Sequence, residues 1–134
     1  MSIKYQRAFD QSLPPGYDGV FDWDFLKPAF NGTKIEPMDI DALVERRGRF
    51  LIFETKTPNK ETPQGQLIAL EQLIKLGRGN IHLFFLWGKT IETIVAMEEW
   101  SYRNGAIVKS DRVDCDGVYV LKRVSAWFKY ANKF

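Results

Sequence analysis

The stretch from residue 38 to residue 56 constrains the fold most strongly, because it joins two strand-like runs through a short turn. Residues 38–45 and 49–56 have the length and composition of strands, and the segment Arg46-Arg47-Gly48 between them is typical of a tight turn. We predict a β-hairpin in which Arg46 pairs with Arg49 across a two-residue loop. A shift of one residue would mix the two faces of the hairpin and expose its apolar side chains, so this register is favoured.

The predicted register sorts the side chains of the hairpin onto two faces, since directly opposed residues point to the same side. One face is expected to be core and carries Met38, Ile40, Ala42, Val44, Leu51 and Phe53. The other face is apolar near the turn, where it carries Leu43, Phe50 and Ile52. Farther from the turn this second face is charged, because Asp41 opposes Glu54 and Asp39 opposes Lys56 there.

This charged patch places three carboxylates and one ammonium close together, and such an arrangement needs a compensating interaction. Like charges opposed across strands destabilise a sheet, and a buried carboxylate has a raised pKa unless a cation compensates its charge. The simplest compensation is a divalent metal, since Mg²⁺ takes one or two carboxylates together with water and phosphate oxygens. Lys56, two residues after Glu54, can hold an attacking water or balance a phosphoryl oxygen. These features outline metal-assisted phosphodiester hydrolysis.

A helix is predicted after the hairpin. Thr62 followed by Pro63 is a favourable start, with an N-cap residue before proline at the first helical position. The helix is expected to run to Leu76 and to stop at Gly77. Its apolar face carries Leu67, Leu70, Leu73 and Ile74. Gln66 lies on that face, either near the strand end that carries the charged patch or as a satisfied polar residue at the rim of the core.

The remaining chain predicts more sheet and a terminal helix. Residues 81–88 are nearly all apolar, which is typical of a central strand covered on both faces, and the intervening helix makes this strand parallel to 49–56. His82 and the four tryptophans are interpreted mainly as core or rim residues. Further elements are expected as strands at 91–100, 106–113 and 119–121, a terminal helix at 124–132 and a short helix at 22–27 broken at Pro28. The predicted fold class is α/β (α+β), with a hairpin followed by a βαβ crossover.

The composition limits the number of domains, the compartment and the kinds of partner, but it says nothing more about the chemistry of the site. A length of 134 residues predicts a single domain with a real core. Cys115 is the only cysteine, which excludes an internal disulfide and fits a reducing cytoplasm. The absence of a long apolar run or a signal peptide predicts no membrane association. The net charge of +2 is too small to indicate a polyanionic partner, so nucleic-acid binding would depend on local basic residues, of which Lys60 is the best candidate.

Taken together, these residues resemble the PD-(D/E)xK nuclease superfamily. The resemblance rests on Asp41, then on Glu54-Thr55-Lys56 after the hairpin, and then on Gln66 in the following helix. Within the superfamily, Glu-Thr-Lys-Thr-Pro followed by glutamine in the opening turn of a helix is similar to VRR-NUC-type and Holliday-junction-resolvase-like members. The resemblance covers residues 34–88, and small phage-encoded proteins of this kind are common.

The resemblance implies a restriction-endonuclease-like fold, in which helices flank a mixed β-sheet. It implies a Mg²⁺- or Mn²⁺-dependent nuclease that acts on DNA, in the bacterial host cytoplasm if the protein is phage-encoded. By motif position, Asp41 and Glu54 are metal ligands, and the backbone carbonyl of Thr55 adds a third. Lys56 is then the catalytic lysine, and Gln66 is the supporting residue on the helix.

The chain departs from the pattern of the superfamily at its first acid. A proline often stands directly before the aspartate, whereas here Pro37 is followed by Met38 and Asp39. Alignment by the proline favours Asp39, while the hairpin geometry favours Asp41 because it lies opposite Glu54. We take Asp41 as the main ligand and keep Asp39 as a second acid.

Structure-specific endonuclease cleavage is favoured over site-specific cleavage, because a chain of this length has little room for added recognition segments. Many such enzymes act as homodimers so that two strands can be cut. The alternative is a catalytically silent module that binds nucleic acid or protein on the same scaffold, although an inactive relative should have lost one of Asp41, Glu54 or Lys56. The residues do not separate DNA from RNA, endonuclease from exonuclease, or branched from linear substrates.

Overall fold

A computed structural model of the chain describes residues 21–58 and 61–133, and these fall into two compact units divided between Ile40 and Asp41. In the first unit, the 3₁₀ helix η1 (Asp24–Phe30) follows Asp22, whose carboxylate accepts a hydrogen bond of 2.9 Å from the amide of Asp24. The predicted break at Pro28 is wrong, because η1 continues through the proline. Trp23 is 48% exposed and is therefore not a core residue.

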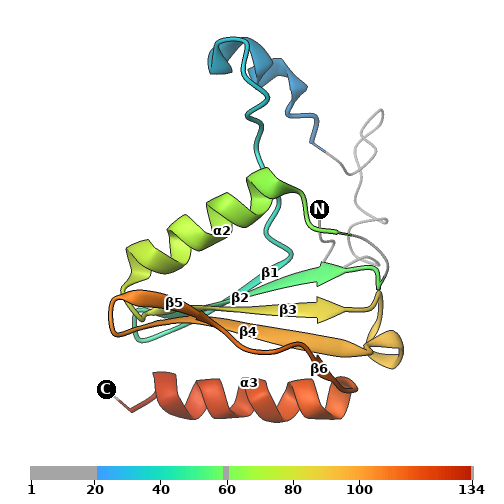
Figure 1. The fold of residues 1–134 in the computed structure, drawn as a ribbon, viewed down its shortest axis with the longest axis vertical. Coiled ribbons are helices and arrows are strands. Elements are labelled where there is room, and N and C mark those ends of the chain that lie inside the picture. Colours follow the sequence, from blue (N-terminus) through green and yellow to red (C-terminus); the bar gives the residue numbers. More distant parts are fainter. Residues whose placement is uncertain (1–20, 59–60, 134) are drawn as a thin grey trace, which may run out of the picture. The chain divides into compact units, whose positions relative to one another are not determined.

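The second unit is built on a mixed sheet with a helix on each face (Figure 1). The strand order is β1 (Ala42–Arg46), β2 (Arg49–Lys56), β3 (Ile81–Trp87), β4 (Ala96–Arg103) and β5 (Ala106–Lys109), and β6 (Val113–Asp114) pairs with the start of β4. Strands β2 and β3 are parallel, as predicted, and the other described pairs are antiparallel. The predicted fold class is confirmed, and the architecture is consistent with a restriction-endonuclease-like fold.

The hairpin has the predicted register. Arg46 pairs with Arg49, and the two loop residues Arg47 and Gly48 have φ values of 53° and 80°, as a tight hairpin turn requires. The first strand, however, begins at Ala42 instead of residue 38. The face predicted as core is buried only on β2: Leu51 is 0% exposed, whereas Met38, Ile40, Ala42 and Val44 are exposed. In the second unit, β1 is an edge strand, and its first four residues are exposed.

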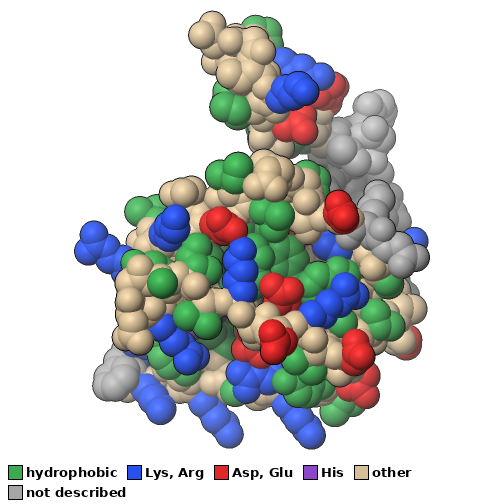
Figure 2. All heavy atoms as spheres, in the orientation of Figure 1, with side chains coloured by type: hydrophobic (Ala, Val, Ile, Leu, Met, Phe, Trp, Pro, Cys, Tyr) green, Lys and Arg blue, Asp and Glu red, His purple; other side chains and the backbone are tan. Residues whose placement is uncertain are grey.

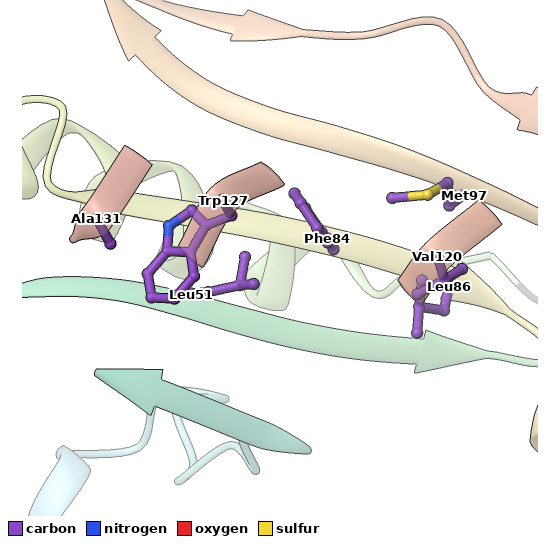
Figure 3. Packing of buried hydrophobic residues seen from close by; sticks show 7 residues of the cluster. All are labelled: Leu51, Phe84, Leu86, Met97, Val120, Trp127 and Ala131. Carbon is purple, nitrogen blue, oxygen red and sulfur yellow. The ribbon is translucent and has the colours of Figure 1, made fainter. Parts of the chain in front are cut away.

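Two apolar clusters lie on the two faces of the sheet. One joins the sheet to α3 (Gly117–Ala131) and consists of Leu51, Phe84, Leu86, Met97, Val120, Trp127 and Ala131 (Figure 3). The other joins the sheet to α2 (Gln64–Gly77) and consists of Ile52, Leu70, Ile74, Leu83, Phe85 and Trp100. Because successive residues of β3 point to opposite faces and both faces are covered, nearly every residue of this strand is apolar.

The boundaries of α2 differ slightly from the prediction. The helix begins at Gln64, with Pro63 in the N-cap position, so Thr62 is not the cap. It ends at Gly77 as predicted, but the left-handed residue is Arg78, with a φ of 50°. Gly77 is required for another reason, because a Cβ atom there would lie 2.5 Å from Cγ1 of Ile81.

The C-terminal helix is longer than predicted. It begins at Gly117 instead of residue 124, and it includes residues 119–121, which were predicted as a strand. The carboxylate of Asp116 caps its first turn by accepting a hydrogen bond of 3.0 Å from the amide of Tyr119. The cap and the helical spacing of Val120, Trp127 and Ala131 against the sheet outweigh the strand preference of the local sequence.

The remaining boundary differences follow from local hydrogen bonds. The predicted strand 106–113 is two strands, β5 and β6. At the end of β5 the Ser110 amide donates a hydrogen bond of 2.8 Å to the carbonyl of Glu99, while the Ser110 hydroxyl, in place of its carbonyl, accepts one of 2.8 Å from the amide of Glu99. The predicted strand 91–100 begins only at Ala96, after the short 3₁₀ helix η2 (Ile91–Thr93). Within the described residues, no helix is both long enough and apolar enough to cross a membrane.

The cap of α3 can be tested by substitution. Asp116→Ala should lower the free energy of unfolding by about 1 kcal/mol, because the amide of Tyr119 loses its acceptor at the helix start. Urea denaturation measures this change. Asp116→Ser, which restores an acceptor, should recover most of the loss, and the exposed Asp111→Ala serves as a control. Equal stability of Asp116→Ala and the parent protein would contradict the capping role.

Candidate active site

The site is centred on Glu54, a charged residue at a core position. Along β2 the side chains of Ile52, Glu54 and Lys56 point to the face covered by α2, since alternate residues of a strand share a face. Glu54 is 2% exposed, although a carboxylate is seldom buried so completely without a partner. The strand therefore buries a negative charge at the end where α2 begins.

Gln66 of α2 connects the two charged residues of this strand. Its side-chain oxygen accepts a hydrogen bond of 2.6 Å from Nζ of Lys56, and its side-chain nitrogen donates one of 3.0 Å to Oε2 of Glu54. Nζ of Lys56 lies 3.9 Å from the same Glu54 oxygen. The structure thus brings together three residues that the sequence placed at one site, and both polar ends of the Gln66 amide are used there.

Asp41 supplies a second carboxylate next to the end of β2. Its Oδ2 atom accepts hydrogen bonds from the backbone amide of Thr55 at 2.8 Å and from the Thr55 hydroxyl at 3.0 Å. The register of the hairpin, continued by one residue beyond Ala42, places Asp41 opposite Glu54, as predicted. Asp41 therefore lies beside the buried glutamate and is anchored to its neighbour in the strand.

The surroundings of Glu54 favour its protonated form in the absence of a cation. Burial and the nearby charge of Asp41 raise the pKa of Glu54 from 4.5 to about 7, against the opposing effects of Lys56 and Gln66. In addition, Oε1 of Glu54 is buried and has no hydrogen-bond partner among the described residues. The single ammonium of Lys56 does not fully compensate the two carboxylates.

This donor set fits a divalent cation. A cation beside Glu54 would satisfy the unpartnered oxygen and remove the electrostatic penalty of the paired acids. Oxygen ligands suit Mg²⁺, which commonly takes only one or two carboxylates from the protein. In the described part of the chain, no group of three or more His, Cys, Asp or Glu side chains is arranged to hold a metal. The predicted ligands, Asp41, Glu54 and the Thr55 carbonyl, contain two such side chains.

Two predicted residues are not placed at the site. Asp39 belongs to the first compact unit, and its role as a second acid stays a prediction. Lys60 lies outside the described residues, so its predicted contact with nucleic acid is also untested. The exposed lysines of α3, including Lys122 and Lys129, are on the helix that covers the other face of the sheet. Figure 2 shows Lys and Arg side chains projecting from the side of the molecule on which Figure 1 draws α3. The lysines of α3 do not border Glu54.

Sequence reasoning missed two residues beside the site. Trp87 pairs directly with Lys56 in the sheet and lies on the same face, where it packs with the α2 cluster. The guanidinium of Arg112 lies over the Trp87 ring, with Cζ 4.2 Å from the ring centroid, and Arg112 forms no ion pair among the described residues. Trp87 was interpreted as core and Arg112 was not singled out, because the chain segments that carry them are far apart in sequence.

The raised pKa of Glu54 predicts a pH-dependent stability of the metal-free protein. Because the folded state favours the protonated carboxyl, this stabilisation is complete below about pH 4.5 and is lost as the pH rises through about 7. Between about pH 5 and pH 8 in EDTA, the parent protein should lose about 3 kcal/mol of unfolding free energy relative to Glu54→Gln. Urea denaturation at several pH values measures this difference.

An exposed glutamate provides the control for this experiment. Glu92→Gln should follow the pH profile of the parent protein, since Glu92 lies at the surface in η2. A pH profile of Glu54→Gln that is parallel to that of the parent protein would show that Glu54 is not the titrating group.

The chain was compared with protein-family models, with curated proteins and with solved structures. No family model matches it, and neither a curated protein nor a solved structure is significantly similar to it. Any inference about function therefore depends on the fold and on the geometry around Glu54.

Proposed function

We propose that this chain is a divalent-metal-dependent nuclease of the PD-(D/E)xK type that hydrolyses phosphodiester bonds in DNA. The observation that carries the proposal is the hydrogen-bonded set of Glu54, Gln66 and Lys56, with Asp41 beside it. These residues come from a hairpin and from the helix that follows it. The charge of the buried Glu54 carboxylate is only partly compensated, which suits a metal ligand. The Lys56 ammonium beside it suits a group that assists hydrolysis at a bound metal.

Asp41, Glu54 and the backbone carbonyl of Thr55 would hold the metal. A bound Mg²⁺ or Mn²⁺ supplies Lewis-acid polarisation of phosphoryl oxygens and lowers the pKa of water. The chain contributes the orientation of the ligands. Asp41 is held by the amide and hydroxyl of Thr55, and Glu54 is held by Gln66, so both carboxylates are positioned before a cation or a substrate arrives.

Lys56 supplies the positive charge that the reaction needs next to these acids. Its side chain is 16% exposed, and its ammonium is directed by Gln66 at 2.6 Å. From this position Lys56 orients the attacking water or balances the charge that develops on the phosphoryl oxygens, as preorganised donors do in a site with little water. Gln66 acts as a positioning residue, since it contacts Lys56 and Glu54 and orients both.

Arg112 extends the site toward the substrate. The face of Trp87 holds its guanidinium next to the strand position of Lys56, and a stacked arginine loses little further freedom when it binds a phosphate. We assign Arg112 to a phosphate of the DNA backbone near the scissile bond. Such a contact positions the strand and carries no sequence information. It is compatible with a structure-specific endonuclease, and a homodimer would allow two strands to be cut.

The competing function is a module that binds nucleic acid or protein without cleavage. A binding surface does not require a carboxylate that is 2% exposed and has an unpartnered oxygen. It also does not require a lysine held against that carboxylate by a glutamine. The arrangement therefore favours catalysis, and a cleavage assay separates the two functions.

The assay should compare a four-way junction, a flap, single-stranded DNA and linear and circular duplexes, each with Mg²⁺, Mn²⁺ or EDTA. We expect metal-dependent cutting that falls by about 100-fold or more in Glu54→Gln, which removes a proposed metal ligand, and in Lys56→Ala, which removes the ammonium that acts on the water or the reacting phosphate. Lys129→Gln, an exposed change on α3, should cut like the parent protein. Binding of these substrates by the folded protein without any cutting would favour the non-catalytic module instead.

The role of Arg112 predicts a different kinetic signature. Arg112→Gln should raise KM by about tenfold, with a smaller effect on kcat, and should lower the slope of log K against log salt by about one. Trp87→Leu should act in the same direction, because it removes the ring on which the guanidinium lies. Arg78→Gln, at the exposed end of α2, is the control. An unchanged KM and an unchanged salt slope in Arg112→Gln would show that Arg112 does not contact a phosphate of the substrate.

A further inference from the structure

A groove with a volume of about 800 Å³ lies on the α3 face of the sheet. Helix α3 packs over Leu51, Phe84 and Leu86 of β2 and β3, and the groove runs between this helix and strands β4 and β5. Its lining includes His82, Glu99, Ser101 and Arg103 from the sheet and Trp127 and Tyr130 from the helix. Because Glu54 points to the α2 face, the groove is separate from the candidate active site.

The floor of the groove is polar where packing alone would favour apolar residues. Met97, Glu99, Ser101 and Arg103 alternate along β4 and share the α3 face. Met97 is buried in the core, whereas the next three positions carry polar or charged side chains, of which Ser101 is 9% exposed. The hydrophobic cluster thus stops where the groove begins, although the sheet continues. Aromatic walls with a few convergent polar groups are the usual lining of a small-ligand site.

Two buried nitrogen atoms of groove residues have no hydrogen-bond partner among the described residues. They are Nε1 of Trp127, whose side chain is 5% exposed, and Nδ1 of His82. The indole nitrogen lies on the side of the ring turned away from Leu51 (Figure 3). Buried polar atoms in proteins nearly always have a partner, so two unpartnered nitrogens from residues of one groove indicate a missing polar partner, which for the indole N–H must be an acceptor.

Of the two arginines in the described lining of the groove, Arg103 and Arg123, only Arg103 is not paired with a carboxylate. Glu99 is occupied by Arg123, which donates to its two carboxylate oxygens at 2.6 and 2.9 Å. Arg103 is exposed and forms no ion pair among the described residues. Burial, together with Arg103, lowers the pKa of His82, so its imidazole is neutral near pH 7. The groove therefore offers an indole N–H, a neutral imidazole and a free guanidinium beside aromatic rings.

We propose that this groove binds a nucleotide, either free or as part of a strand. A base presents hydrogen-bond acceptors at its edge, which suits the indole N–H of Trp127. Its planar face packs against aromatic rings, which suits Tyr130, a ring that is 38% exposed and lies beside His82 and the guanidinium of Arg49. A phosphate is the natural partner of the guanidinium of Arg103. The volume lies within the range of ordinary small-ligand sites. This inference does not rest on the proposed cleavage, because it concerns the other face of the sheet.

The indole N–H of Trp127 gives a direct test by nuclear magnetic resonance. The full chain, labelled with ¹⁵N and kept in EDTA, is titrated with TMP, with AMP and with inorganic phosphate, and the Trp127 signal is assigned from Trp127→Phe. We expect TMP or AMP to shift the Trp127 indole signal and the ring signals of His82 in a saturable way. Phosphate alone should shift them less, because it lacks the base.

Variants then locate the binding site. Arg103→Gln, a change at an exposed residue, should weaken nucleotide binding by about tenfold, since it removes a charged donor to the phosphate. Lys129→Gln on α3 is the charge-matched control and should bind like the parent protein, and Glu54→Gln should also bind normally. Equal affinity of Arg103→Gln and the parent protein would overturn the proposal, as would nucleotide shifts confined to residues around Glu54.

The two sources of the nucleotide are separated by a parallel titration with oligonucleotides. A single-stranded oligonucleotide that shifts Trp127 more strongly than TMP or AMP indicates a nucleotide within a strand, and the reverse order indicates a free nucleotide. Failure of TMP, AMP and the oligonucleotide to shift Trp127 and His82 at millimolar concentration would reject the site. That result would leave the proposed nuclease activity untouched, since the activity is measured separately.

Discussion

The burial of Glu54 at the end of β2 is the constraint on which the candidate site depends. A carboxylate in this position is stable only when other groups supply hydrogen bonds or positive charge, and the chain supplies them from two directions. Lys56 comes from the same face of the strand, and Gln66 comes from the first turns of α2. The start of the helix is thereby joined to the end of the strand by polar contacts, beside the apolar contacts that hold the rest of α2.

The negative charge of Glu54 and Asp41 is only partly compensated by the protein, and this imbalance bears on the chemistry of the site. Gln66 uses both ends of its amide, but one oxygen of Glu54 remains without a partner and Asp41 adds a second negative charge nearby. A structural ion pair would normally balance its charges within the protein. A metal site without its cation has an excess of negative charge of the kind found around Glu54. This excess is the physical basis for the proposed metal-dependent hydrolysis.

The two faces of the sheet are used differently. The α2 face combines a core with the charged cluster and with Arg112, which lies on Trp87. The α3 face has a core under the helix and a polar groove beyond it, because α3 spans only part of the sheet. The alternation of side chains along β2 and β4 thus produces two separate candidate sites from one scaffold, with no residue shared between them.

The register of the hairpin, the parallel central strand and the shared face of Glu54 and Lys56 could all be predicted from the sequence, whereas the helical spacing left Gln66 open between the charged patch and the rim of the core, and only the resemblance assigned it to the site. Each of the first three depends on local periodicity or on a short turn, and a strand followed by a helix leaves few ways to connect to the next strand. The start of α3 could not be predicted in this way, because the Asp116 cap and packing against the sheet outweighed the local strand preference of residues 119–121. Tertiary structure alone decided that Arg112 lies on Trp87, that β1 is an exposed edge and that His82 and Trp127 line one groove. These contacts join positions distant in the chain, so they depend on which strands are neighbours and on how far each helix covers the sheet.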